Sequence, residues 1–219
     1  MGHDGPVVAP VWDLPTRVVH WLLVVLIPFS WWSAENGHLP WHRLSGYCIL
    51  GLLLFRLAWG FVGSHTARFA DFVRGPRGVF AYLRSGGSGV VGHSPLGGWS
   101  VAAMLALLAA QVSLGLFAVD EDALEAGPLS KFVEFDTGRA IAKLHHVTFN
   151  ILLGLIALHL MAIIFYAFRR QNLVGPMITG RRLLGEGARA PHMAPLWRAG
   201  LLAVVVILVV RFVALGLRL

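Results

Sequence analysis

The chain has 219 residues, of which 57% are hydrophobic and only 13% are charged, and its mean hydropathy is +0.70. A soluble domain carries nearer a quarter charged residues, so this composition excludes an ordinary soluble protein and favours a polytopic membrane protein. The net charge of +7 does not indicate nucleic-acid binding, because the basic residues cluster beside apolar runs and form no separate patch.

Apolar runs long enough to cross a bilayer, which takes roughly 20 helical residues, occur five times along the chain. The first follows a short polar tail marked by proline, which we expect to be poorly ordered. The predicted spans are residues 15–32, 41–62, 99–119, 143–170 and 196–217. The sequence therefore predicts an all-α fold with five transmembrane helices.

The connections between these runs differ in length and charge. Residues 63–98 are rich in Gly, Arg and Pro, and within them residues 69–83 are expected to form a short helix on the surface. Residues 120–136 form an acidic connection. We expect four regions: a tail (1–14), a four-helix transmembrane domain (15–170), a basic linker (171–195) and an additional transmembrane helix (196–219).

Arginines are concentrated in two of these connections, residues 63–98 and residues 171–195. Cations collect on the cytoplasmic side of membrane proteins, so these two connections and the N-terminus are predicted to be cytoplasmic. The C-terminus then lies on the opposite, periplasmic side.

The fourth span carries imidazoles, which are costly inside a membrane and normally mark a site. His145 and His159 are fourteen residues apart, so they lie on nearly the same face of a helix, about 21 Å apart along its axis. His146 is out of phase and is the alternative to His145. Two imidazoles on one face, half a membrane apart, suit the binding of two stacked haems.

The remaining ligands follow from depth in the membrane. His20 lies at the same side as His159 and gives an inner pair, and His42 lies at the same side as His145 and gives an outer pair. The only cysteine, Cys48, excludes a C-x-x-C-H motif, so these haems would be held without a covalent link. Two histidines leave no open position on the iron, which suits electron transfer.

Other polar residues near the spans are candidates for contacts with the cofactors. Arg56, inside the second span, would bind a haem propionate or a quinone oxygen, or would extend to the membrane surface. Arg17 and Arg43 adjoin ligand candidates and would hold propionates or anchor the helices at the interface. His93 precedes the third span, and we interpret it as solvated or, alternatively, as facing a quinone pocket.

Four stretches together resemble the bacterial cytochrome b561 family, which includes the cytochrome b subunits of nickel–iron hydrogenases. They are VWDLPTRVVHW, WHRLSGYCILGLLLFRLAWGFVG, GHSPLGGW and LHH…ALHL, and the similarity covers about residues 11–180. The resemblance implies an inner-membrane four-helix bundle that holds two b haems through His20, His42, His145 and His159. The fifth span departs from the compact form of the family and is expected to pack beside the bundle or to dock a partner helix.

The resemblance also implies a function in respiratory electron transport. We expect the chain to relay electrons between a membrane quinone, ubiquinone or menaquinone, and a periplasmic c-type cytochrome or oxidoreductase subunit. The alternative is a stand-alone superoxide:ubiquinone oxidoreductase. That enzyme would attract its anionic substrate with positive charge, whereas residues 120–136 are acidic.

Overall fold

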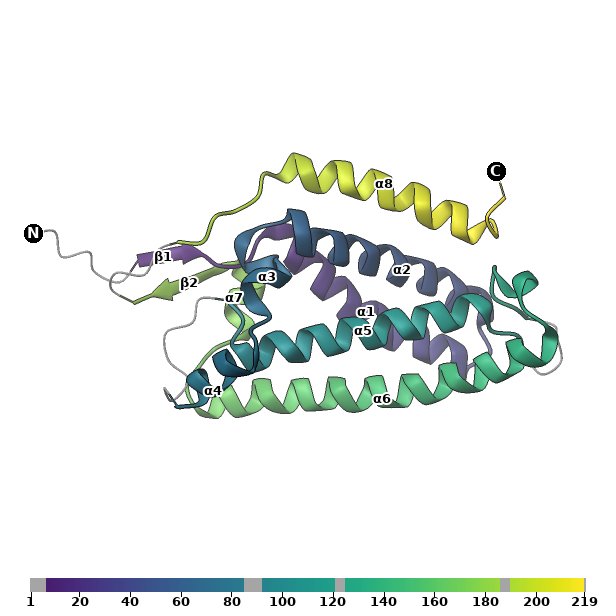
Figure 1. The fold of residues 1–219 in the computed structure, drawn as a ribbon, viewed down its shortest axis with the longest axis horizontal. Helices are drawn as coiled ribbons and strands as arrows, with labels where there is room; N and C mark the ends of the chain where they lie inside the picture. The colour runs from purple at the N-terminus through teal and green to yellow at the C-terminus, as the bar shows by residue number, and fades with distance from the viewer. Residues whose placement is uncertain (1–6, 85–91, 121–124, 186–189, 219) are drawn as a thin grey trace, which may run out of the picture. The chain divides into compact units, whose positions relative to one another are not determined.

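The computed structural model describes residues 7–84, 92–120, 125–185 and 190–218 and is mostly helical (Figure 1). The elements in chain order are β1 (Val7–Pro10), α1 (Leu14–Glu35), α2 (Leu39–Val62), α3 (Phe69–Phe72), α4 (Pro76–Arg84), α5 (Pro95–Phe117), α6 (Phe135–Phe168), α7 (Val174–Thr179), β2 (Arg181–Leu184) and α8 (Leu196–Ala214), with 3-10 turns at His65–Ala67 and Ser130–Phe132.

Among the described residues, α1, α2, α5, α6 and α8 are long and apolar enough to cross a membrane, which confirms the five predicted spans. The largest difference is at α6, which has 34 residues and begins at Phe135, eight residues before the predicted start. Its length of about 51 Å exceeds the roughly 30 Å of a hydrocarbon core. The end of the acidic connection, including Asp136, therefore belongs to the helix.

Helix α1 begins where Asp13 caps it. The carboxylate oxygen Oδ1 of Asp13 accepts a hydrogen bond from the backbone N–H of Thr16 at 2.8 Å, three residues along, which satisfies one of the unpaired donors of the first turn. The helix ends at a turn in which Gly37 adopts φ = 72° and the N–H of His38 donates to the carbonyl of Ser33 at 2.8 Å. Leu39 and Pro40 then start α2.

Two compact units make up the chain. Unit 1 contains residues 1–19, 56–103 and 157–200, and unit 2 contains residues 20–55, 104–156 and 201–219. Each of the five long helices contributes a segment to both units. The units are described in turn.

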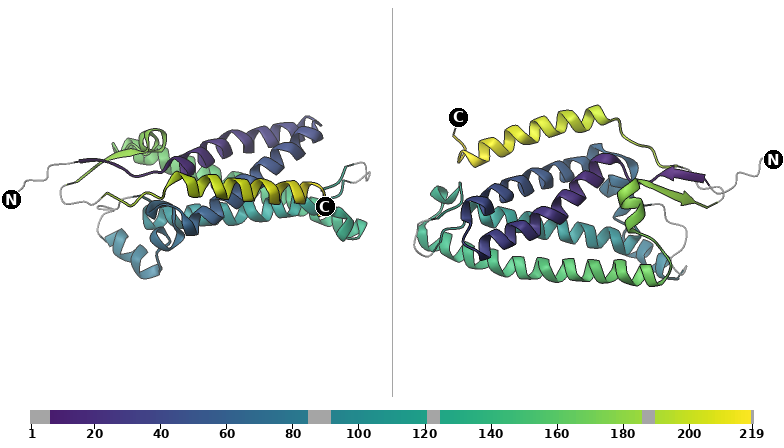
Figure 2. Two further views of the ribbon diagram at one scale, coloured as in Figure 1. Left: turned by 90° about the horizontal axis from the view of Figure 1, so that it is seen from above. Right: turned by 180° about the vertical axis from the view of Figure 1, so that it is seen from behind.

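Unit 1 contains a small antiparallel ladder in which Val7 of β1 pairs with Leu184 of β2 and Pro10 pairs with Arg181 (Figure 2). Gly180, in the left-handed conformation at φ = 78°, ends α7 and turns the chain into β2. Its carbonyl accepts hydrogen bonds from the N–H groups of Val11 and Trp12. The tail and the linker are thus paired, and the expectation of a poorly ordered tail is wrong for residues 7–10; residues 1–6 lie outside the described part.

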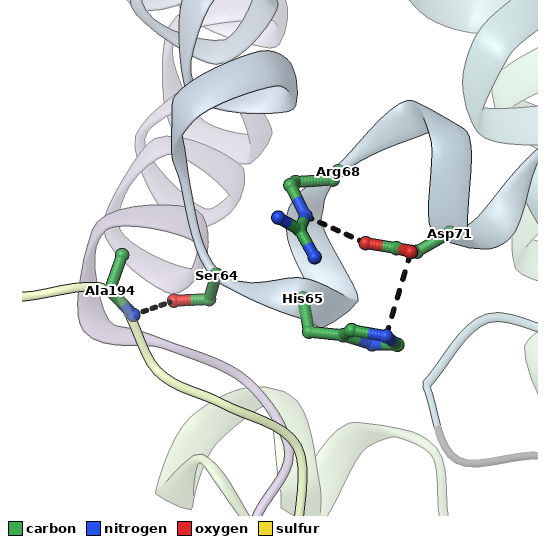
Figure 3. Close-up of polar contacts among 5 residues, drawn as sticks. All are labelled: Ser64, His65, Arg68, Asp71 and Ala194. Atoms are coloured by element: carbon green, nitrogen blue, oxygen red, sulfur yellow. Dashed lines mark hydrogen bonds and ion pairs between the residues drawn. The ribbon is translucent and has the colours of Figure 1, made fainter.

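The linker is also tied to the segment that follows α2. The hydroxyl of Ser64 accepts a hydrogen bond from the N–H of Ala194 at 2.9 Å (Figure 3). The N–H of His65 donates to the carbonyl of His192 at 3.1 Å. Thr66 donates its hydroxyl to the carbonyl of Val11 at 2.6 Å. Much of the predicted linker is therefore structured, as α7, β2 and this tied segment.

Unit 2 contains the remaining segments of the five long helices. Helix α8 packs on α2, because a Cβ placed on Gly51 would lie 3.5 Å from Val210 and 3.8 Å from Val206. The connection between α5 and α6 folds back on the end of α5, where the N–H of Leu129 donates to the carbonyl of Leu116 at 2.9 Å. The fifth span thus packs beside the bundle, one of the two arrangements that the sequence leaves open.

The surface helix predicted at residues 69–83 is broken into two. Helix α3 ends at Phe72 and α4 begins at Pro76. Proline fixes its own φ and disfavours the helical conformation in the residue before it, so the chain leaves the helix ahead of Pro76 and starts a new one there.

Candidate functional site

The imidazoles of His42 and His145 face each other in unit 2. His42 lies in the first turn of α2 and His145 lies in the third turn of α6, and their ring centroids are 6.2 Å apart with an angle of 88° between the ring planes. His145 is half-buried, whereas His146 is exposed. The geometry agrees with the helical phase that favoured His145 over His146.

Both rings are held by a backbone carbonyl of a neighbouring helix. Nδ1 of His42 lies 2.9 Å from the carbonyl oxygen of Ser30 in α1, and Nδ1 of His145 lies 2.9 Å from the carbonyl oxygen of Gln111 in α5. A carbonyl oxygen only accepts, so each Nδ1 carries the hydrogen and each Nε2 presents a lone pair. This is the arrangement of a metal-ligating histidine, whose second ring nitrogen is normally fixed by such a bond.

The side chain of Gln111 completes the surroundings of His145. Its amide nitrogen Nε2 lies 3.1 Å from Nε2 of His145, and its amide oxygen accepts a hydrogen bond from the hydroxyl of Thr148. A metal bound at Nε2 of His145 would replace the first of these bonds. The hydrogen bond to Thr148 joins α5 to α6.

Gly115 allows the His145 ring to lie close to α5. A Cβ at position 115 would lie 3.0 Å from Cε1 and 3.4 Å from Nδ1 of His145, which is tighter than an ordinary contact. Sequence reasoning missed this glycine and the carbonyl of Ser30. The only signal for Gly115 is a glycine in an apolar helix, which by itself indicates close packing of an unspecified partner.

The pair fits a haem iron. An iron bound to two imidazole nitrogens at about 2 Å each places the ring centroids roughly 6 Å apart, as they are here. A porphyrin supplies the four other ligands itself. Among the described residues, no group of three or more His, Cys, Asp or Glu side chains could hold a bare metal ion. The pair His42 and His145 therefore suits a metal that brings its other ligands with it.

The predicted inner pair, His20 and His159, is divided between the two units, and it stays a prediction. Both side chains are half-buried, and the ring of His20 packs edge-on against Trp21 at 5.0 Å.

Two of the three candidate arginines bind protein groups. Arg43, next to His42, forms an ion pair with Glu125, and Nη1 of Arg17 donates a hydrogen bond to the carbonyl of Ile178. Their roles toward haem propionates stay predictions. The pair with Glu125 neutralises one of the charges of the acidic connection.

Arg56 lies in a buried part of unit 1. Only 5% of it is exposed, its guanidinium lies 5.3 Å from the ring of Phe69 and 5.8 Å from that of Phe72, and its Nη1 is buried without a hydrogen-bond partner among the described residues. Asp13 is close enough to interact with it electrostatically. The Asp13 carboxylate also accepts a hydrogen bond from the indole of the fully buried Trp59 at 2.9 Å.

His93 is half-buried and packs between two aromatic rings. Its centroid lies 4.6 Å from that of Phe72 and 4.6 Å from that of Trp12. The expectation that this loop histidine is solvated is therefore wrong. Phe72 is shared, because Arg56 lies against it as well.

A family model described as "Prokaryotic cytochrome b561" matches residues 11–180. The chain belongs to the prokaryotic cytochrome b561 family. Such a protein is a multi-pass membrane b-type cytochrome of electron transfer, and its cofactor is haem b. No curated protein and no solved structure matches the chain.

Proposed function

We propose that the chain is a diheme cytochrome b of a bacterial inner membrane, which relays electrons between the quinone pool and a periplasmic redox partner. His42 and His145 would bind the outer haem, and His20 and His159 the inner one. The partner would be a c-type cytochrome or an oxidoreductase subunit.

The observation that carries this proposal is the facing pair His42 and His145, in which each Nδ1 lies on a backbone carbonyl and each Nε2 remains as the nitrogen that can bind a metal. Haem b supplies a one-electron redox centre when it is bound there. Ligation by two histidines leaves no open coordination position, so the protein suits electron exchange better than chemistry at the iron. The residues Ser30, Gln111 and Gly115 fix the orientation of the two rings.

The distribution of charge supports a cytoplasmic location of unit 1. It contains 12 of the 18 Lys and Arg residues and four of the 11 Asp and Glu residues, for a net charge of +8, whereas unit 2 has a net charge of −1. By the positive-inside rule, this surplus of cations favours the cytoplasmic side for the segments that unit 1 contains. The N-terminus would then be cytoplasmic and the C-terminus periplasmic.

Quinone binding is proposed at the buried group formed by Arg56, Phe72 and His93. Arg56 carries an N–H without a partner among the described residues, and such a buried donor is costly unless an acceptor meets it. Asp13 already supplies the charge that balances Arg56, so a neutral quinone oxygen suits the remaining N–H better than a propionate, which would be a second anion.

The experiment that tests the proposal is a redox-titrated absorption spectrum of the detergent-purified chain with haem measured per chain. We expect two low-spin b haems with separate potentials. His42→Ala and His145→Ala should each remove one haem, whereas the matched control His146→Ala should retain both. Retention of both haems in His145→Ala, or an unmodified chain that binds none, would refute the assignment.

The same sample separates the relay from superoxide oxidation. A superoxide:ubiquinone oxidoreductase would reduce its haems on addition of superoxide and would pass the electrons to added quinone without a protein partner. The pairing of Arg43 with Glu125 removes a free cation from beside His42 and disfavours this alternative.

A further inference from the structure

Helix α4 presents an unusual outer face. Its nine residues include Phe80, which is 68% exposed, and Arg77 and Arg84, which are exposed and lie three residues before and four residues after it. Residues at these spacings share one face of a helix, so the two guanidinium groups flank the exposed phenyl ring. A large exposed aromatic residue between two cations is the pattern of a helix that lies in a membrane interface.

The opposite face of α4 is attached to the rest of unit 1. The indole N–H of Trp99, in the second turn of α5, donates to the carbonyl of Arg74 at 2.8 Å, just before α4. The hydroxyl of Tyr82 is hydrogen-bonded to that of Tyr166 in α6. These two contacts fix the orientation of α4 in unit 1, and they therefore also fix the direction of its outer face.

Trp99 also indicates the depth at which α4 lies. Half of its surface is exposed, and it is near the start of a membrane-spanning helix, where tryptophan rings normally sit among lipid headgroups. Since Trp99 holds the carbonyl of Arg74 directly, the start of α4 lies at the level of the headgroups too.

The charge of this surface selects anionic lipid. Helix α4 has no acidic residue, and the described residues include no ion-pair partner for Arg77 or Arg84. Arg68 differs, because its Nε donates to the carboxylate of Asp71 at 2.7 Å, and His65 lies 3.5 Å from the same carboxylate (Figure 3). The charges of Arg77 and Arg84 are therefore available to phosphate.

We propose that the outer face of α4 is a binding surface for anionic phospholipid in the membrane leaflet that borders unit 1. Phe80 enters the boundary between the headgroups and the acyl chains, and Arg77 and Arg84 contact headgroup phosphates. This surface is independent of haem number and of the quinone site.

The test measures the depth of a nitroxide label beside Phe80. The label is placed at Ala81, which is exposed on the same face, in a Cys48→Ser background, because Cys48 is also exposed. The labelled chain is reconstituted in phosphatidylcholine with or without phosphatidylglycerol. Collisions of the label with oxygen, which concentrates in the bilayer, are compared with collisions with a water-soluble nickel complex.

We expect phosphatidylglycerol to protect the label from the nickel complex, and Arg77→Gln with Arg84→Gln to reverse this protection. Each arginine near an anionic surface contributes about fivefold to the binding equilibrium. The matched control is Arg181→Gln, which removes an exposed arginine of β2 and should leave the collision ratio unchanged.

A salt titration of the labelled chain keeps the test decisive if the double variant fails to fold, because added salt should weaken the protection in the same way. The haem spectrum serves as the check on folding. Equal collision ratios in the two lipid mixtures, whether the label is protected or not, would overturn the proposal, since either result means that anionic headgroups do not bind α4.

Discussion

Gly115→Ala is the most direct test of how His145 is held. The added methyl group would lie 3.0 Å from Cε1 of His145, whereas carbon atoms in ordinary contact are about 3.5–4 Å apart. The ring must therefore move by about half an ångström or leave its rotamer, which costs roughly 0.5–1.5 kcal/mol. Its hydrogen bond to the carbonyl of Gln111 would be distorted with it.

The expected effects on haem and on folding differ in size. Replacing glycine by alanine inside a helix stabilises it by about 1 kcal/mol, which offsets the steric cost, so the folded chain should be about as stable as before. Loss of the support around a metal ligand typically lowers metal affinity about 10- to 100-fold. The variant should thus fold and span the membrane but retain the outer haem poorly.

The assay is haem per chain after detergent purification, with a redox titration of what remains. Gly154→Ala is the control, because it makes the same change in α6 at a position where a Cβ would meet nothing within 4 Å. If Gly115→Ala kept two haems at unchanged potentials, the argument that α5 orients His145 as an iron ligand would be refuted.

Two further changes test the packing of unit 1. Gly98→Ala would place a Cβ 2.5 Å from the carbonyl oxygen of Phe72, and the backbone there cannot easily move away. We therefore expect this variant to lose thermal stability in detergent. The control Gly75→Ala, whose Cβ would meet nothing within 4 Å, should keep its thermal stability. Ser64→Ala removes the acceptor of the Ala194 N–H, a bond worth about 1 kcal/mol, and should speed proteolysis of the segment before α8; an unchanged cleavage rate would mean that this bond does not restrain it.

The sequence predicts the spans well because their signal is local. Hydropathy alone places all five, and the fourteen-residue step from His145 to His159 predicts which face of α6 carries the candidate ligands. The fixed helical repeat then predicts that His145, and not His146, turns inward, as the structure has it.

The surroundings of the histidines could not be predicted in the same way. The acceptors of the two Nδ1–H groups are backbone carbonyls of Ser30 and Gln111. Because every residue has a backbone carbonyl, the sequence does not indicate which one will accept the hydrogen bond. The pairing of β1 with β2 joins segments at opposite ends of the helical domain, and four residues carry too little pattern to reveal a partner so far away. His93 was misjudged because its aromatic neighbours come from two other segments.

The β1–β2 ladder restricts the number of times that the chain can cross the membrane. Strands can pair only on the same side of a bilayer, so the chain must cross an even number of times between Pro10 and Arg181. Helices α1, α2, α5 and α6 provide four crossings, and the loss of any one of them would leave β1 and β2 on opposite sides of the membrane. Insertion errors that skip one span would therefore be detectable as a broken ladder.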